Sequence, residues 1–328
     1  MNTTSDRAFV TGVAGMIGSN TARKLLADGR AVVGVDNLWR GRLENIADLL
    51  GNKNFTFRHA DIAADQDWFR DMRTNDALIH IADIVAGIGY VFANEWGVFQ
   101  KNLLINTAVA RIVNVLQPAR FIYLGTACSY PQAMQRSVAA SVLSESAKFP
   151  ADPESGYGWS KLLGEIEFRL AVKNTGTKLL VLDLHNVYGW PCVYRDSTAQ
   201  VIPSLINRAL TSKDRTLTVW GDGTQGRAFV HVRDVVAAIV LALRYAGETP
   251  TFMIGPGKCT TIGELAEMIR DHPSVGIDSV VFDVNRPTGD IGRFADASLA
   301  TRELGWSPSI GFRQGLHELI DRIVDDLR

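Results

Sequence analysis

The stretch that decides the fold is Ala8-Phe9-Val10-Thr11-Gly12-Val13-Ala14-Gly15-Met16-Ile17-Gly18. Its start, Ala8–Thr11, has the apolar character of a strand, and helical spacing of apolar residues runs over Ile17–Ala27. Glycines at such a strand-to-helix turn let the backbone turn tightly and approach a pyrophosphate, whose charge meets the helix N-terminus. Elsewhere in a chain, the same glycine spacing is weak evidence for a binding site and is typical of a structural turn. At this position it predicts a dinucleotide-binding unit.

Strand-length apolar runs alternate with helical patterns through the first half of the chain. Most runs are continuously apolar, as in a parallel sheet with helices on both faces. The predicted strands are Ala8–Thr11, Ala31–Asp36, Asn54–Phe57, Ala77–Ile81, Phe121–Leu124 and Leu179–Leu184. The predicted helices between them are Ile17–Ala27, Asp65–Met72, a stretch near Val98–Leu116, and Tyr157–Lys173. This order predicts an α/β fold with a doubly wound parallel sheet of the Rossmann type.

The composition of the sequence changes after about residue 185, where glycine, proline and other turn-forming residues become frequent. Short helices are predicted at Val201–Leu210, Ile262–Arg270 and Phe312–Leu327, whereas the apolar helix Val232–Leu243 looks buried enough to join the first unit. We therefore expect a Rossmann domain of residues 1–184 plus about 228–252. A smaller α/β substrate domain, residues 185–227 plus about 253–328, should cap the carboxyl edge of the sheet.

Composition excludes several classes of function. The 328 residues carry 34 Lys plus Arg against 35 Asp plus Glu, so no basic excess points to a nucleic acid or an anionic membrane. The longest strongly apolar run is far shorter than the ~20 residues of a bilayer helix, and the polar N-terminus shows no signal peptide. Three distant cysteines and scattered histidines argue against a disulfide framework and structural zinc. We expect a cytoplasmic, metal-free protein that holds anions in a local pocket.

Asp36 ends the second predicted strand, where a carboxylate can accept both ribose hydroxyls of an adenosine. Its charge would repel a 2′-phosphate, which favours NAD over NADP as the cofactor. Arg40 and Arg42 lie just beyond and could moderate that preference. Asp61 and Ile62 follow the third strand and could reach the adenine, although a capping role for Asp61 is the alternative.

Tyr157 and Lys161 begin a predicted helix, and residues four apart share one helical face. An ammonium beside the phenol, together with a positive nicotinamide, would lower the phenol pKa from its usual value near 10. Such a phenol can take a proton from a sugar hydroxyl as hydride leaves. Thr126, just after the fifth strand, would offer a hydroxyl to the same substrate oxygen.

Together these residues resemble the extended short-chain dehydrogenase/reductase family of NAD-dependent nucleotide-sugar epimerases. The resemblance covers nearly the whole chain and includes His185–Gly189, Trp220–Gly223, Arg227–Asp234 and Arg286–Asp290. Three segments resemble the GDP-mannose 3,5-epimerase branch and, less closely, GDP-fucose synthase: residues 82–89, 126–131 and 184–189. In such enzymes NAD oxidises a sugar carbon, usually C4, and the ketone activates neighbouring positions.

The resemblance implies a set of site residues. The cofactor contacts would be Gly12, Gly15, Met16, Ile17, Gly18, Asp36, Asn37, Asp61, Ile62, Ala82, Asn102, Tyr157 and Lys161. The substrate contacts would be Gly87, Asn186, Gln200, Trp220, Arg227 and Arg286. The two arginines would clamp a diphosphate, a role that suits a bidentate guanidinium. Trp220 would either stack on the nucleotide base or pack within the cap.

The resemblance also implies that Cys128 protonates a carbon next to the ketone, a role suited to a thiol. The alternative is a small buried residue in a tight loop. Gln200 stands where relatives carry a basic second acid/base, which puts inversion at C3 and C5 in doubt. Ala127 and Cys128 replace the Asp-Glu pair of 4,6-dehydratases, and the Glu of sugar decarboxylases is also absent. Asp183 stands where the family often carries Arg.

We therefore expect an NAD-dependent epimerase for a nucleotide-diphosphate sugar, GDP-linked, that inverts C4 through a 4-keto intermediate. The alternatives are a GDP-sugar 3,5-epimerase or epimerase/reductase that uses Cys128, and a non-catalytic NAD-binding regulator. The catalytic residues would be Thr126, Tyr157, Lys161 and Cys128. We also expect a homodimer. The predicted helices near Val98–Leu116 and at Tyr157–Lys173 carry apolar residues outside the stripe that faces the core, and these residues would form the interface. Examples are Val109, Ile112, Val113, Leu162 and Ile166.

Overall fold

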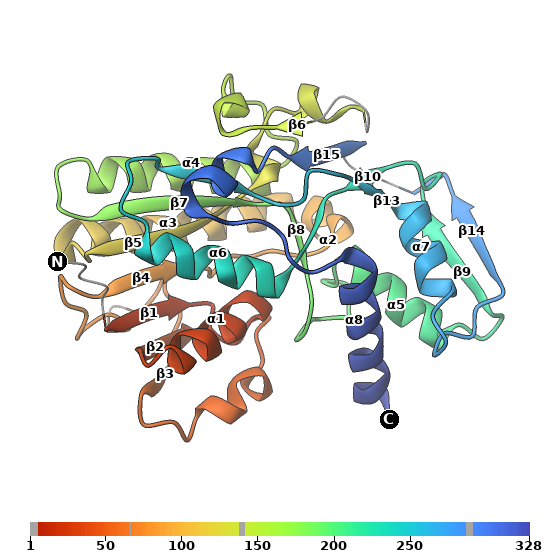
Figure 1. Ribbon diagram of the computed structural model, residues 1–328, viewed down its shortest axis with the longest axis horizontal. Coiled ribbons are helices and arrows are strands. Elements are labelled where there is room, and N and C mark those ends of the chain that lie inside the picture. The colour runs from red at the N-terminus through yellow and green to blue at the C-terminus, as the bar shows by residue number, and fades with distance from the viewer. Residues whose placement is uncertain (1–5, 66, 138–141, 287–290) are drawn as a thin grey trace.

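A computed structural model of the chain describes residues 6–65, 67–137, 142–286 and 291–328. Its centre is a seven-stranded sheet in the order β12-β7-β5-β4-β1-β2-β3, and every neighbouring pair is parallel (Figure 1). The strands are β1 Arg7–Thr11, β2 Ala31–Asp36, β3 Phe55–His59, β4 Ala77–His80, β5 Arg120–Thr126, β7 Lys178–Leu184 and β12 Thr251–Ile254. This arrangement confirms the predicted doubly wound α/β sheet.

Helices cover both faces of the large sheet. On one face, α1 (Met16–Ala27) and α6 (Val232–Arg244) pack together, and their apolar residues share a core with the sheet. On the other face, α3 (Glu95–Leu116) packs along α4 (Gly156–Val172), and the core there includes Val109, Val113 and Phe168. Burial on both faces explains why the sheet strands are almost continuously apolar.

Smaller elements gather at one end of the sheet (Figure 1). A separate apolar cluster joins the helices α5 (Val201–Thr211), α7 (Ile262–Arg270) and α8 (Phe312–Leu327). The small strands are β6 Val142–Leu143, β8 Asn186–Tyr188, β9 Thr216–Trp220, β10 Gly226–Arg227, β11 Phe229–His231, β13 Thr260–Thr261, β14 Ser279–Asp283 and β15 Gly292–Ala295. The remaining elements are α2 (Ile88–Ala93), the 3₁₀ helices Leu43–Leu49, Ala127–Ser129, Gln132–Gln135 and Glu145–Lys148, and a π-helical turn at Ala300–Leu304.

The structure differs from the sequence prediction at residues 65–72 and at the predicted domain boundary near residue 252. The predicted helix Asp65–Met72 is wrong: its described residues, 65 and 67–72, form a turn flanked by irregular chain. Trp68 and Met72 are nevertheless buried against the sheet, so the apolar spacing reflected core contacts made without a helix. The predicted division at residue 252 cuts through β12, and Ala300, Leu304 and Trp306 join the core of the large sheet. Apart from these residues, the division of the chain into two domains stays a prediction.

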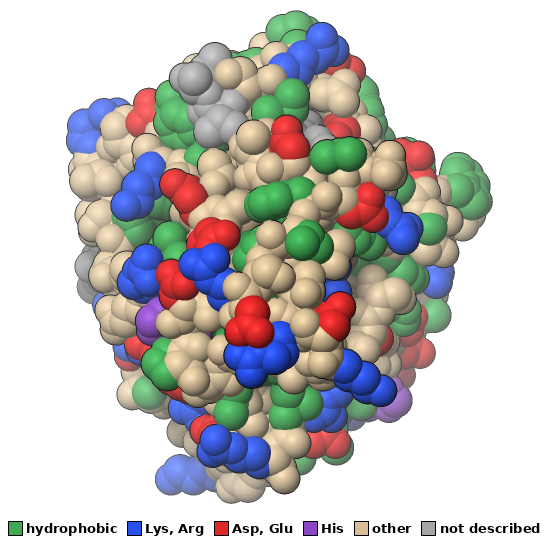
Figure 2. Space-filling view, turned by 90° about the vertical axis from the view of Figure 1, so that its right-hand side faces the viewer, with side chains coloured by type: hydrophobic (Ala, Val, Ile, Leu, Met, Phe, Trp, Pro, Cys, Tyr) green, Lys and Arg blue, Asp and Glu red, His purple; other side chains and the backbone are tan. Residues whose placement is uncertain are grey.

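Charge is finely mixed on the face at the small-element end. Lys and Arg side chains alternate with Asp and Glu over this face (Figure 2). Among the described residues, no helix combines the length and apolar composition needed to cross a membrane. Over the same residues, no group of three or more His, Cys, Asp or Glu side chains is arranged to hold a metal ion.

Candidate active site

One cavity of about 1590 Å³ lies where the carboxyl ends of the central strands meet the small elements. Its lining comes from the loops after β1, β2, β3, β4 and β5 on one side, and from β8, α5, β9 and β10 on the other. Parallel α/β sheets bind ligands at this edge. We refer to the first side, formed by the loops after the sheet strands, as the cofactor wall, and to the second side as the substrate wall.

The glycine turn of the cofactor wall has the geometry of a diphosphate cradle. Gly12 adopts a φ of +70°, which L side chains rarely tolerate. A Cβ on Gly18 would lie 2.1 Å from the Gly12 carbonyl oxygen, so only glycine allows α1 to begin this close to β1. Gly15 is the N-cap of α1 and supplies no side-chain cap, which leaves helix N–H groups for a ligand. These residues fit the diphosphate of a dinucleotide.

Asp36 is fixed at the end of β2 by two backbone donors. Its carboxylate accepts hydrogen bonds from the Ala14 N–H at 2.9 Å and from the Leu38 N–H at 2.8 Å. Burial raises the pKa of Asp36, against the effect of these hydrogen bonds. The side chain lines the cavity, as a ribose-binding carboxylate must.

Most of the other predicted cofactor residues also line the cavity, namely Gly12, Gly15, Met16, Ile17, Gly18, Asn37, Asp61, Ile62, Ala82, Tyr157 and Lys161. Asp61 also accepts a hydrogen bond from the Ala63 N–H at 2.9 Å, but this bond stabilises a turn rather than capping a helix. Asn102 departs from the prediction and does not line the cavity. Its buried amide instead exchanges hydrogen bonds with the backbone of Ile84, so it positions the loop after β4.

Tyr157 and Lys161 occupy the first turns of α4, and both meet Asp83 from the loop after β4. The Tyr157 hydroxyl donates to the Asp83 carboxylate at 3.2 Å, and the Lys161 Nζ lies 3.4 Å from the same oxygen. The Lys161 ammonium also sits over the ring of Tyr123, 4.5 Å from its centroid. Asp83 is therefore a third polar member of this group.

The protein's own groups do not lower the pKa of Tyr157 as the sequence predicts. Burial raises the pKa of Tyr157 well above its usual value, and the Asp83 carboxylate raises it further. Burial also lowers the pKa of Lys161, against the pull of Asp83. Asp83 was assigned no role from the sequence. Its signals were its position just after a buried strand, at the edge where ligands bind, and its place in the segment 82–89 that carries the family resemblance.

Thr126 and Cys128 line the cavity beside this group. The Thr126 hydroxyl accepts a hydrogen bond from the Cys128 N–H at 3.2 Å, which holds the loop after β5. A Cβ on Gly158 would lie 2.2 Å from the Cys128 carbonyl oxygen, so this glycine lets the start of α4 approach that loop. Cys128 is half-buried, and it is therefore accessible from the cavity, as either of its predicted roles allows.

The substrate wall contains Asn186, Gln200, Trp220 and Arg227. Gly87 faces this wall from the loop after β4, and a Cβ there would lie 2.3 Å from the Ala199 carbonyl oxygen. Five of the six predicted substrate residues therefore line the same cavity.

Arg286 is the exception among the predicted substrate residues, because it is not in the cavity lining. Its guanidinium lies over the Trp220 ring, 5.6 Å from the centroid, and its Nε donates to Asp283. The rest of the Arg286–Asp290 motif, residues 287–290, lies outside the described residues. Arg286 therefore touches the cavity only through Trp220.

Asp183, which departs from the family's usual Arg, belongs to a buried charge cluster under the site. Its carboxylate lies 2.6 Å from the Lys148 Nζ and accepts a hydrogen bond from the Tyr130 hydroxyl at 2.8 Å. Lys148 also contacts Glu165 at 2.5 Å. Where the family often carries Arg, this chain thus has a carboxylate that is paired with the buried Lys148.

The glycine cradle, Asp36 and the Tyr157–Lys161 pair in one cavity define an NAD-dependent enzyme built on a doubly wound α/β fold. Residues 8–255 match the NAD dependent epimerase/dehydratase family. The chain belongs to that family, which confirms both the predicted resemblance and NAD as the cofactor.

Curated relatives cover almost the whole chain. GDP-mannose 3,5-epimerase 1 of Oryza sativa subsp. indica is 26% identical over 310 residues, 94% of this chain and 79% of the relative. A putative UDP-glucose 4-epimerase of Methanocaldococcus jannaschii is 29% identical over 326 residues, 98% of this chain and 99% of the relative. The resemblance to GDP-mannose 3,5-epimerase is thus confirmed, alongside a similarity to UDP-sugar enzymes.

Solved structures share the fold over the same length. UDP-glucose 4-epimerase of Thermotoga maritima, solved with UDP-glucose, has a TM-score of 0.86 at 25% identity and covers 98% of this chain and 100% of its own. UDP-glucuronic acid 4-epimerase of Bacillus cereus, in complex with UDP-glucuronic acid and NAD, has a TM-score of 0.82 at 25% identity, with 98% and 100% covered.

Proposed function

We propose that this protein is a nucleotide-sugar epimerase that inverts C4 of a GDP-linked sugar through a 4-keto intermediate. One observation carries the proposal: Thr126, Tyr157 and Lys161 line the same cavity as the NAD cradle. C4 chemistry needs only these groups and space for the sugar to turn. Gln200, at the N-cap of α5, supplies no second base for other carbons.

The residues divide the work of the reaction. NAD, when bound, supplies the reversible hydride acceptor for C4. Tyr157 takes the proton from the sugar's O4 and later returns it, and the Thr126 hydroxyl holds the same oxygen. Lys161 stabilises the ionised phenol by its charge. Asn186 and Arg227 hold the nucleotide sugar from the substrate wall, where a guanidinium suits a diphosphate. Inversion of C4 would require the sugar to turn within the cavity before hydride was given back to its opposite face.

A second function, 3,5-epimerisation, has its own support in Cys128. The thiol lies in the cavity beside Thr126, and a GDP-mannose 3,5-epimerase is among the relatives. That reaction breaks a C–H bond by proton loss at C3 or C5, with Cys128 as the acid/base. C4 inversion exchanges no carbon-bound proton with water, because hydride moves to the cofactor and back.

Turnover in deuterated water separates the two functions. A 4-epimerase should give product without deuterium on carbon, and Cys128→Ala should keep much of the rate. Mass spectrometry and NMR of the product read the label. Deuterium at C3 or C5 that disappears in Cys128→Ala would favour 3,5-epimerisation instead. A panel of GDP-, UDP- and dTDP-sugars, followed by NMR, tests the nucleotide, and turnover of UDP-sugars alone would contradict the GDP assignment.

We also propose that the protein acts in the cytoplasm as a homodimer through α3 and α4. Four of the five residues expected at that interface are buried inside the subunit, because Val109, Ile112, Val113 and Leu162 pack into the core. The exposed apolar residues of these helices are instead Trp96, Leu104, Val115, Trp159, Leu163, Ile166 and Leu170. The last four follow helical spacing and form one stripe.

Light scattering at micromolar concentration tests the dimer. Ile166→Glu places a charge in the exposed stripe of α4 and should produce a monomer, whereas Glu318→Gln on α8 should not. A wild-type monomer would contradict the proposal.

A further inference from the structure

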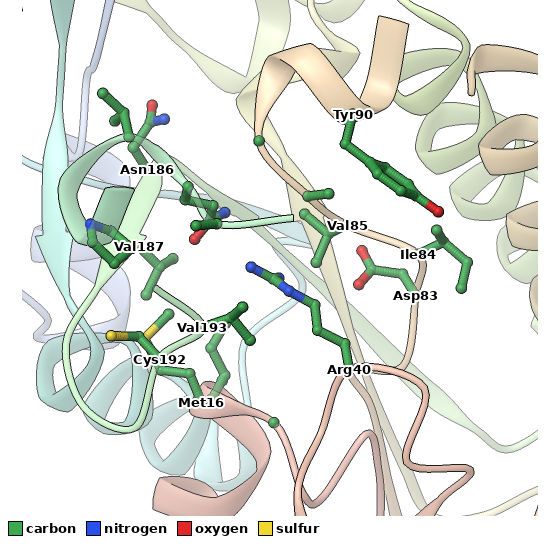
Figure 3. Close-up of a pocket in the computed structure, with 18 of the residues that line it drawn as sticks. Met16, Arg40, Asp83, Ile84, Val85, Tyr90, Asn186, Val187, Cys192 and Val193 are labelled. Atoms are coloured by element: carbon green, nitrogen blue, oxygen red, sulfur yellow. The ribbon is translucent and has the colours of Figure 1, made fainter. Parts of the chain in front are cut away.

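Arg40 is a half-buried cation that lines the cavity. It follows β2, and its side chain extends into the cavity between Asp83 and Val193 (Figure 3). Its Nη2 donates to the Thr198 carbonyl at 3.1 Å, while its Nε is buried and has no hydrogen-bond partner. A guanidinium keeps its charge in such surroundings. From its place after the second strand, Arg40 was expected only to moderate the preference for NAD over NADP.

The protein supplies little to balance this charge. Across the described ranges, no carboxylate oxygen lies within 4.0 Å of the Arg40 guanidinium, although Asp83 and Asp196 act on it from farther away. The Thr198 carbonyl is shared, since it also accepts the Gly87 N–H at 3.2 Å. By contrast, Arg23 binds Asp48 through two nitrogens. Even a half-buried cation loses hydration without gaining a close counter-ion, so the position of Arg40 favours an anionic ligand.

We propose that Arg40 binds a diphosphate in this cavity, either that of NAD or that of the nucleotide sugar. A guanidinium suits this ligand because its planar fork donates two parallel hydrogen bonds to phosphate oxygens. The Thr198 carbonyl holds one nitrogen, and the guanidinium lines the cavity in which the ligand would lie. The contact also ties the loop after β2 to the loop before α5, so a diphosphate held here would bridge the two walls. The second source rests on the proposed function.

Binding titrations of Arg40→Gln, Arg40→Lys and wild type test the inference. Calorimetry with NAD, GDP and UDP measures the diphosphate ligands, and adenosine and guanosine measure binding without phosphate. Arg40→Gln should weaken at least one diphosphate ligand tenfold or more and leave the nucleosides within twofold. Arg40→Lys should restore part of the loss, because it keeps the charge and loses the fork. Arg313→Gln, an exposed arginine on α8 outside the cavity lining, is the matched control.

The pattern of losses identifies the source. A loss for NAD alone assigns the cofactor diphosphate, and a loss for GDP or UDP alone assigns the nucleotide sugar. Losses below threefold for every diphosphate ligand would overturn the inference, as would equal losses for the nucleosides. Because binding is measured without turnover, a protein that turns over no sugar would contradict the proposed function and leave this inference standing.

Discussion

The two walls of the cavity differ in whether backbone or side-chain groups form them. The cofactor wall is mostly backbone: the glycine turn approaches β1 closely, and Asp36 is held by two main-chain N–H groups. The substrate wall is mostly side chains, such as Gln200 and Arg227, on short elements. A backbone wall is fixed by local sequence and serves one ligand. A side-chain wall changes with single substitutions, which is how one fold serves many substrates.

The largest effect should come from Tyr157, which lines the cavity from the first turn of α4. Tyr157→Phe removes the hydroxyl that moves the O4 proton, so kcat should fall about 10²–10⁴-fold. Steady-state kinetics with the sugar found in the nucleotide panel measure the loss. NAD affinity, measured by calorimetry, should change little, because the ring remains. Wild-type kcat in Tyr157→Phe would remove this residue from the chemistry.

The second effect tests the cofactor wall alone. Wild type should bind NAD at least about tenfold more tightly than NADP, a difference of about 1.4 kcal/mol. Asp36→Ala should weaken NAD and tolerate NADP, because the fixed carboxylate both accepts the ribose hydroxyls and repels a 2′-phosphate. Calorimetric titration of both cofactors measures this preference.

Asp61→Asn is the matched control for the cofactor preference, since it removes a carboxylate from the same wall near the predicted adenine site. It should leave the ratio of the two affinities unchanged. Equal affinities of the wild type for NAD and NADP would contradict the charge argument.

The same contrast explains what sequence could predict. The strand ends, Gly12 and Asp36 could be predicted from the sequence because they lie within one local strand–helix–strand unit. Asp83 was assigned no role and Arg40 only an effect on cofactor preference, because their partners Tyr157 and Thr198 lie far along the chain. Asn102 was predicted to touch the cofactor, but its amide is used by Ile84.

Helix periodicity had a similar limit. It identified α3 and α4 but misplaced their exposed faces, because both faces carry apolar residues and only packing decides which one is buried.

The third effect is a shift in pH dependence caused by Asp83. Tyr157 acts as a base only when ionised, and Asp83 raises the pKa of Tyr157. Asp83→Asn should therefore move the acid limb of the kcat/KM profile to lower pH. Cys128, Tyr123 and Lys161 also face the phenol and remain in place.

Asp196→Asn is the control for that shift, because Asp196 lies in the same cavity but does not act on Tyr157. Its profile should match the wild type. An acid limb that stays in place in Asp83→Asn would mean that Asp83 does not tune the phenol.

The smallest effect should come from the rim of the substrate wall, at Trp220 and Arg286. The ring is 36% exposed and its interaction with Arg286 is a cation–π contact, worth about 0.5–1 kcal/mol at an exposed site. If the ring stacks on a nucleotide base, Trp220→Ala should weaken GDP binding about tenfold, and Arg286→Gln about threefold because the ring loses its support. NAD affinity should stay unchanged in both, since neither residue belongs to the cofactor wall. A Trp220→Ala variant that melts at lower temperature while binding GDP normally would instead assign the ring to packing within the cap.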